Sequence, residues 1–166
     1  RIPEAQFIFF KFPDMPTDLL KARLSKLFSE ANLDFNHQVI FIPLLPVTQF
    51  YGLMKVANVF LDTLGFSGFN TAIQAIECGL PIVTRRGQFM RWRLASGLLE
   101  QMGLHSLVSN THEDYVQQAV KLITDSGYKL DISNQMTFHR QNLYGDLKTI
   151  KALEDFLVKA CNSEKS

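Results

Sequence analysis

Short apolar runs alternate along this chain with segments whose apolar residues have helical spacing. Continuous runs rich in β-branched and aromatic residues predict strands at residues 6–12, 38–42, 59–61, 81–84 and 105–108. Apolar residues three or four positions apart predict helices at residues 16–28, 48–57, 68–76, 89–102 and 111–123. We expect Gly79 to end the third of these helices, and Thr111, with Asp114 three residues later, to cap the last one. A further helical stretch at 131–159 is interrupted near Tyr144 and Gly145, which predicts two helices.

The alternation of strands and helices indicates the fold class. A helical connection between successive strands predicts an α/β fold with a parallel sheet and right-handed crossovers. Continuous apolar strands indicate that both faces of the sheet are covered. We therefore expect a Rossmann-like open parallel sheet of about five or six strands, with helices on both faces. We expect a single domain over residues 1–166, in which residues 131–160 form C-terminal helices.

Composition narrows the possible partners and the compartment. The formal net charge of +1 gives no electrostatic argument for binding nucleic acid or a membrane surface. No apolar run is long enough to span a bilayer. Cys78 and Cys161 are too few for a disulfide framework, so we expect a reduced, cytoplasmic protein. The chain begins with Arg1 and has no signal peptide, and we expect it to be a piece of a longer protein.

The expected ligand edge lies beyond the carboxyl ends of the strands. Three loops should emerge at that edge, at residues 43–47, 62–70 and 85–87. In the middle loop, Gly65 and Gly68 allow a tight turn from strand to helix. The free amides of a helix start, together with the helix dipole, suit a diphosphate. The alternative is that the polar residues of this loop, Ser67, Asn70 and Thr71, only cap the helix.

The same loop lies within an ordered set of short segments that carries a family resemblance. The set comprises residues 59–63, 68–71, 78–84 with Gly87, 93–96, 103–104, 114–115 and 119–122. In this order they resemble the C-terminal, donor-binding lobe of GT-B glycosyltransferases. The similarity is to the O-linked N-acetylglucosamine transferase family and to bacterial cytoplasmic N-glycosyltransferases. It implies a domain that binds a UDP-sugar.

The resemblance also implies site residues, several of which depart from the family pattern. At the diphosphate loop, a His-Thr-Thr triplet of the family is replaced by Phe69, Asn70 and Thr71, which follow Gly68. Asn70 matches the asparagine of the bacterial N-glycosyltransferases. The acidic residue that binds the ribose in the family is replaced by Gln74, whose amide can still hydrogen-bond hydroxyls.

A second loop is implied to lie near the base of the nucleotide. At Pro46 and Val47, and three residues later at Phe50, the family presents a lysine and a histidine that are absent here. Phe50 is then either a stacking surface for uracil or a core aromatic residue. Among the arginines after the fourth strand, we select Arg86 as the cation for the diphosphate. The alternative is that these arginines form a solvated basic surface.

The implied reaction is transfer of a sugar from a UDP-sugar to a protein side chain, without a metal or other cofactor. No catalytic residue is assigned to this chain, because the base and the acceptor site would come from the N-terminal lobe or from the cleft between the lobes. The four histidines lack zinc-ligand spacing, and Glu77 is either a catalytic acid or a solvated helix residue. Two rival functions stay open. They are a related nucleotide-sugar epimerase and a binding or structural domain with a degenerate donor site.

Overall fold

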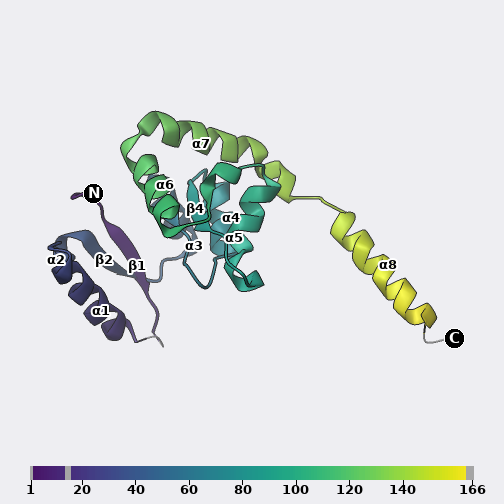
Figure 1. Ribbon diagram of the computed structural model, residues 1–166, viewed down its shortest axis with the longest axis horizontal. Coiled ribbons are helices and arrows are strands. Elements are labelled where there is room, and N and C mark those ends of the chain that lie inside the picture. The colour runs from purple at the N-terminus through teal and green to yellow at the C-terminus, as the bar shows by residue number, and fades with distance from the viewer. Residues whose placement is uncertain (1, 14–15, 164–166) are drawn as a thin grey trace. The chain divides into compact units, whose positions relative to one another are not determined.

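The computed structural model describes residues 2–13 and 16–163 of the chain (Figure 1). The chain divides into two compact units, Arg1–Leu53 and Met54–Ser166, which are described separately below. The expectation that residues 1–166 form one domain stays a prediction. No helix in the described part of the chain is long and apolar enough to cross a membrane.

The first unit is built on two parallel strands joined by helices. Its elements are β1 (Phe7–Lys11), α1 (Thr17–Glu30), α2 (Phe35–Gln38), β2 (Val39–Pro43) and the start of α3 (Val47–Val56). Phe9 of β1 stacks on Phe41 of β2, with ring centroids 5.4 Å apart. The short helix α2 was not expected from the sequence. It forms because the Asp34 carboxylate accepts hydrogen bonds from the backbone amides of Asn36 and His37.

The second unit contains a three-stranded parallel sheet with β4 in the centre. Its elements are β3 (Phe60–Leu61), α4 (Asn70–Glu77), β4 (Ile82–Arg85), η1 (Met90–Trp92), α5 (Leu94–Gln101), η2 (His105–Leu107), β5 (Val108–Ser109), α6 (His112–Thr124), α7 (Ser126–His139), η3 (Arg140–Leu143) and α8 (Lys148–Ser163). α4, α5 and α6 each pack against β4 (Figure 1). The core combines apolar residues of these helices and β4, including Ile76, Ile82, Leu99 and Leu122.

This arrangement confirms the Rossmann-like α/β class, with three differences in detail. The five described strands form two hydrogen-bonded sheets, one in each unit, rather than one sheet of five or six. Residues 105–107 form a 3₁₀ turn, and only Val108–Ser109 continue as a strand. The helix expected at 89–102 is divided, because Arg93 has a non-helical ψ of 6° and α5 starts after it.

The expected capping and termination signals are confirmed in the second unit. The Thr111 hydroxyl accepts a hydrogen bond from the amide of Asp114, as predicted for the start of α6. Gly79 has a φ of +66°, a left-handed conformation that ends α4 and favours glycine. The last helical region breaks before α8, and Gly145 there has a φ of +74°. This outcome confirms the predicted interruption.

Candidate functional site

The loop after β3 is organised by a buried carboxylate. Asp62, only 3% exposed, directly follows Leu61. Its carboxylate accepts hydrogen bonds from the hydroxyl of Ser67 (2.7 Å), the amide of Gly68 (2.8 Å) and the hydroxyl of Thr84 (2.6 Å). Buried carboxylates need such donors to offset the loss of hydration. Asp62 therefore joins the end of β4 to both ends of the turn that leads into α4.

Ser67 does not cap α4, which corrects the expectation from its position in the sequence. Its hydroxyl is buried and accepts a hydrogen bond from the amide of Ala95, in the first turn of α5, at 2.9 Å. The Ser67 amide donates to the carbonyl of Arg91 at 2.7 Å. Ser67 thus caps the next helix and holds the loop after β4 against the loop after β3.

The start of α4 is left open to solvent. Its N-cap residue is Phe69, 48% exposed, which makes no side-chain cap, and its first turn carries no acidic residue. Asn70 and Thr71 are exposed and supply no side-chain cap, so the capping alternative for these two residues is wrong. Gln74 lies one turn further along α4 and is half-buried. The first amides of this helix therefore keep the character of an anion-binding site.

A side chain at Gly68 would crowd the start of α4. A Cβ atom at this position would lie 2.7 Å from the hydroxyl oxygen of Thr71. The Gly68 amide itself points to Asp62, so the amides directed away from the loop begin after it. Gly65, with a φ of +97°, provides the preceding turn.

Tyr115 of α6 supports the same loop from another direction. Its hydroxyl donates a hydrogen bond to the backbone carbonyl of Asp62 at 3.0 Å. Burial, and then the negative charge of Asp62, raise the pKa of this phenol well above its ordinary value. Sequence reasoning assigned no role to Asp62 or Tyr115. The available signal was an acidic residue directly after a strand, at the ligand edge of the sheet.

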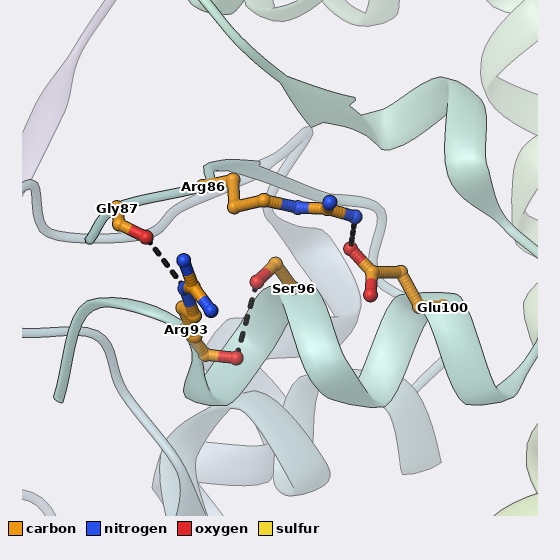
Figure 2. A network of polar contacts seen from close by, with 5 residues as sticks. All are labelled: Arg86, Gly87, Arg93, Ser96 and Glu100. Atoms are coloured by element: carbon orange, nitrogen blue, oxygen red, sulfur yellow. Dashed lines mark hydrogen bonds and ion pairs between the residues drawn. The ribbon is translucent and has the colours of Figure 1, made fainter. Parts of the chain in front are cut away.

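The arginines after β4 are held by partners from their own loop and from α5 (Figure 2). The guanidinium of Arg86 forms an ion pair with Glu100 of α5. Arg93 donates from Nε to the carbonyl of Gly87 at 2.6 Å, which gives it a structural role. Arg91 lies over the ring of Phe89, 4.7 Å from its centroid. The charge of Arg86 is therefore partly neutralised by Glu100.

The three residues expected near the base belong to the first unit. Pro46 is exposed at the start of α3, and Val47 is 67% exposed. Phe50 is half-buried and contacts Phe10 of β1, with ring centroids 5.5 Å apart. This contact is the one expected of a core aromatic residue.

Other candidate chemistry lies away from this loop. Glu77, at the end of α4, accepts a hydrogen bond from the Tyr144 hydroxyl at 3.2 Å, and its carbonyl accepts one from Arg140. Burial, and then the hydrogen bond to Glu77, raise the pKa of Tyr144. No group of three or more His, Cys, Asp or Glu residues that could hold a metal occurs among the described residues. A cavity of about 310 Å³ is lined by residues of η2, β5 and α6, and no residue of the loop after β3 lines it.

Comparison with known proteins identifies relatives over most of the chain. Residues 1–151 match the family model described as glycosyl transferase family 41. The UDP-N-acetylglucosamine–peptide N-acetylglucosaminyltransferase of Giardia intestinalis is 26% identical over 144 residues, which are 86% of this chain and 10% of that protein. The probable enzyme of the same name, SPINDLY, of Eustoma exaltatum subsp. russellianum is 35% identical over 77 residues, 46% of this chain and 8% of that protein.

A solved structure agrees with these relatives. A mutant O-GlcNAc transferase of Thermobaculum terrenum superposes with a TM-score of 0.78 at 27% sequence identity. The superposition covers 93% of this chain and 30% of that chain. The chain thus spans about a tenth of the length of the first two relatives and under a third of the solved transferase.

Proposed function

Because this chain belongs to glycosyl transferase family 41, we propose that it binds the nucleotide part of a UDP-sugar for transfer to a protein side chain. The names of its relatives supply the first donor to test, UDP-N-acetylglucosamine. The chain provides the donor-binding lobe. The catalytic base and the acceptor site belong to the N-terminal lobe, and no metal or other cofactor takes part. The protein acts in the cytoplasm, in keeping with Cys78 and Cys161, neither of which forms a disulfide.

The observation that carries this proposal is the open start of α4. Its N-cap side chain makes no hydrogen bond, and no carboxylate lies in its first turn. The first amides of a helix have no partners within the helix and carry a partial positive charge. A diphosphate supplies acceptors for the amides of the first turn, which follow the Gly68 amide that Asp62 already binds.

The residues around the helix start have separate roles in the proposal. Gly68 allows close approach, and the amides of the first turn with the side chains of Asn70 and Thr71 bind the diphosphate oxygens. Gln74, on the same face one turn later, hydrogen-bonds the ribose. Phe69 stands where the family has a histidine, so stabilisation of the leaving diphosphate falls to the helix dipole and the amides.

Arg86 adds positive charge from the loop after β4. Its guanidinium is paired with Glu100, and both side chains are partly exposed. Such pairs between partly exposed groups are weak, so a diphosphate can compete for the arginine. The predicted contacts of Pro46 and Val47 with the base remain part of the proposal, whereas Phe50 packs against Phe10 as a core aromatic residue.

Calorimetric titration of the chain with UDP, and separately with ADP, tests the proposal. We expect UDP to bind with a dissociation constant in the micromolar to millimolar range, roughly −4 to −8 kcal/mol. The departures from the family pattern at Phe69 and Gln74 place the expected value at the weak end.

Two outcomes of these titrations would change the assignment. Absence of UDP binding would favour a degenerate donor site, since Phe69 and Gln74 have lost family side chains. Tighter binding of ADP than UDP would contradict the uridine assignment. Product analysis with the protein at its full length then separates transfer to a polypeptide from epimerisation of the free nucleotide sugar.

A further inference from the structure

We propose that Asp62 is a positioning residue of the donor site, which fixes the starts of α4 and α5 relative to each other. This inference rests on the proposed function and adds a residue that the sequence argument did not select. Three donors converge on the Asp62 carboxylate, from Ser67, Gly68 and Thr84, at 2.6 to 2.8 Å. Ser67 and Gly68 come from the loop after β3, and Thr84 comes from β4.

The first connection sets the start of α4. The Gly68 amide donates to one carboxylate oxygen of Asp62, two residues before α4 begins at Asn70. Since this amide is taken, the first amides available to an anion are those that follow it. The orientation of the Gly68 peptide group therefore determines where the open first turn points.

The second connection reaches the start of α5. Ser67 donates its hydroxyl proton to Asp62 and accepts from the amide of Ala95. The N-cap of α5, Arg93, makes no side-chain cap of its own, so Ser67 replaces it. One carboxylate thereby links two helix starts that both follow strands of the same parallel sheet.

The third connection anchors the carboxylate to the centre of the sheet. Thr84 is buried on β4 and donates to the same oxygen as Ser67. Among the described residues, no cation lies within ion-pair distance of Asp62. The charge of Asp62 is thus stabilised by hydroxyl and amide dipoles alone, and a shift in any one of them moves the others.

The alternative is that Asp62 only contributes to folding stability. Asp62→Asn separates the two roles, because it keeps the shape of the side chain and leaves one acceptor oxygen for three donors. We expect the variant to stay folded and to bind UDP at least about tenfold more weakly. In transfer assays with the full-length protein, the KM for the donor should rise, while the KM for the acceptor should stay unchanged.

A matched control removes the effect of lower stability. Ile132 is buried on α7, so Ile132→Val should lower the stability of the fold without changing the loop after β3. If it lowers the Tm as much as Asp62→Asn and lowers UDP affinity equally, Asp62 is only structural and the proposal fails. If Asp62→Asn does not fold, Thr84→Val and Ser67→Ala each remove one connection. Unchanged UDP affinity in both would equally overturn the proposal.

Hydrogen exchange tests the network without any nucleotide. In Asp62→Asn the amides of Gly68 and Ala95 should exchange faster than in the unmodified chain, while the Asp114 amide, capped by Thr111, should not change. Unchanged exchange at both Gly68 and Ala95 would show that Asp62 does not position them. If instead UDP fails to bind the unmodified chain, the proposed function fails, and the exchange result still decides the role of Asp62.

Discussion

The starts of α4 and α6 follow strands of the same parallel sheet, yet they are finished in opposite ways. At α6 the Thr111 hydroxyl caps the Asp114 amide, and Glu113 and Asp114 place carboxylates in the first turn. At α4 the N-cap is Phe69, with no side-chain hydrogen bond and no acidic residue. The first amides of α6 therefore find partners in its own sequence, whereas those of α4 do not.

Of these two helix starts in the second unit, only that of α6 gains stability from a cap and from acidic residues of its own. A cap and first-turn acids each stabilise a helix by about 0.5 to 2 kcal/mol. α4 has neither, and its preceding loop is held instead by the hydrogen bonds of Asp62 with Ser67 and Gly68. The α4 start is therefore fixed in position while it remains available to an anion.

The largest expected effect comes from giving α4 the acidic character of α6. Asn70→Asp places a carboxylate in the first turn at almost constant volume. UDP affinity should fall about 100-fold, or roughly 2.7 kcal/mol, because like charges repel across a few ångströms. The Tm should stay constant or rise, since the charge favours the helix dipole. The control is Gln117→Glu, which adds the same charge at an exposed position of α6. An equal loss of UDP affinity in this control would contradict the account.

A steric change at Gly68 should have the next largest effect. In Gly68→Ala the new Cβ meets the Thr71 hydroxyl oxygen at 2.7 Å, so either the Thr71 side chain or the first turn must shift. The free energy of unfolding should fall by about 1–3 kcal/mol, and UDP should bind more than about tenfold more weakly. Thr71→Ala in the same chain relieves the contact and should restore the Tm in thermal melts. A Tm that stays low in the double variant would place the strain elsewhere.

Removing single ligand contacts should have smaller effects. Asn70→Ala should weaken UDP binding by about 1 kcal/mol, roughly fivefold, because one hydrogen bond is lost.

Gln74→Glu should tighten UDP binding roughly threefold by restoring a charged acceptor for the ribose hydroxyls. Calorimetry measures both changes. If UDP binds and neither Asn70→Ala nor Gln74→Ala alters its affinity, the donor site lies elsewhere.

The last prediction concerns folding stability and the hydrogen bond by which Tyr115 supports the loop after β3. Its pKa is raised in the folded chain, so the folded state holds a proton that the unfolded state releases above about pH 10. Stability should therefore be complete below pH 10 and fall as the pH rises above it. Tyr115→Phe should lose about 1 kcal/mol at neutral pH and show a shallower alkaline decline in chemical denaturation. An equally steep decline in both proteins would remove Tyr115 as its cause.

The regular elements of the second unit could be predicted because their signals are local. Thr111 with Asp114, and Gly79 after α4, act through residues a few positions away, and the structure confirms both. The parallel arrangement followed from the order of strands and helices. The tight turn was expected at Gly65 and Gly68, and the structure has it at Gly65, with a φ of +97°.

The inner connections of the site could not be predicted, because they join residues distant in sequence. Ser67 and Ala95 are 28 positions apart, and Tyr115 contacts the carbonyl of Asp62 across 53. Local reasoning assigned Ser67 to the nearest helix start, whereas the fold places its hydroxyl against the next one. The pairing of Arg86 with Glu100 has the same origin, since it depends on how α5 packs against β4.

Amide chemical shifts during a UDP titration test the central claim most directly. The account predicts that UDP shifts the amides in the first turn of α4, at Asn70, Thr71 and Ala72. The amides in the first turn of α6, from His112 to Asp114, should remain unchanged, because that start is capped and acidic. Shifts confined to α6, or spread equally over both helix starts, would contradict the assignment of the open α4 start as the diphosphate site.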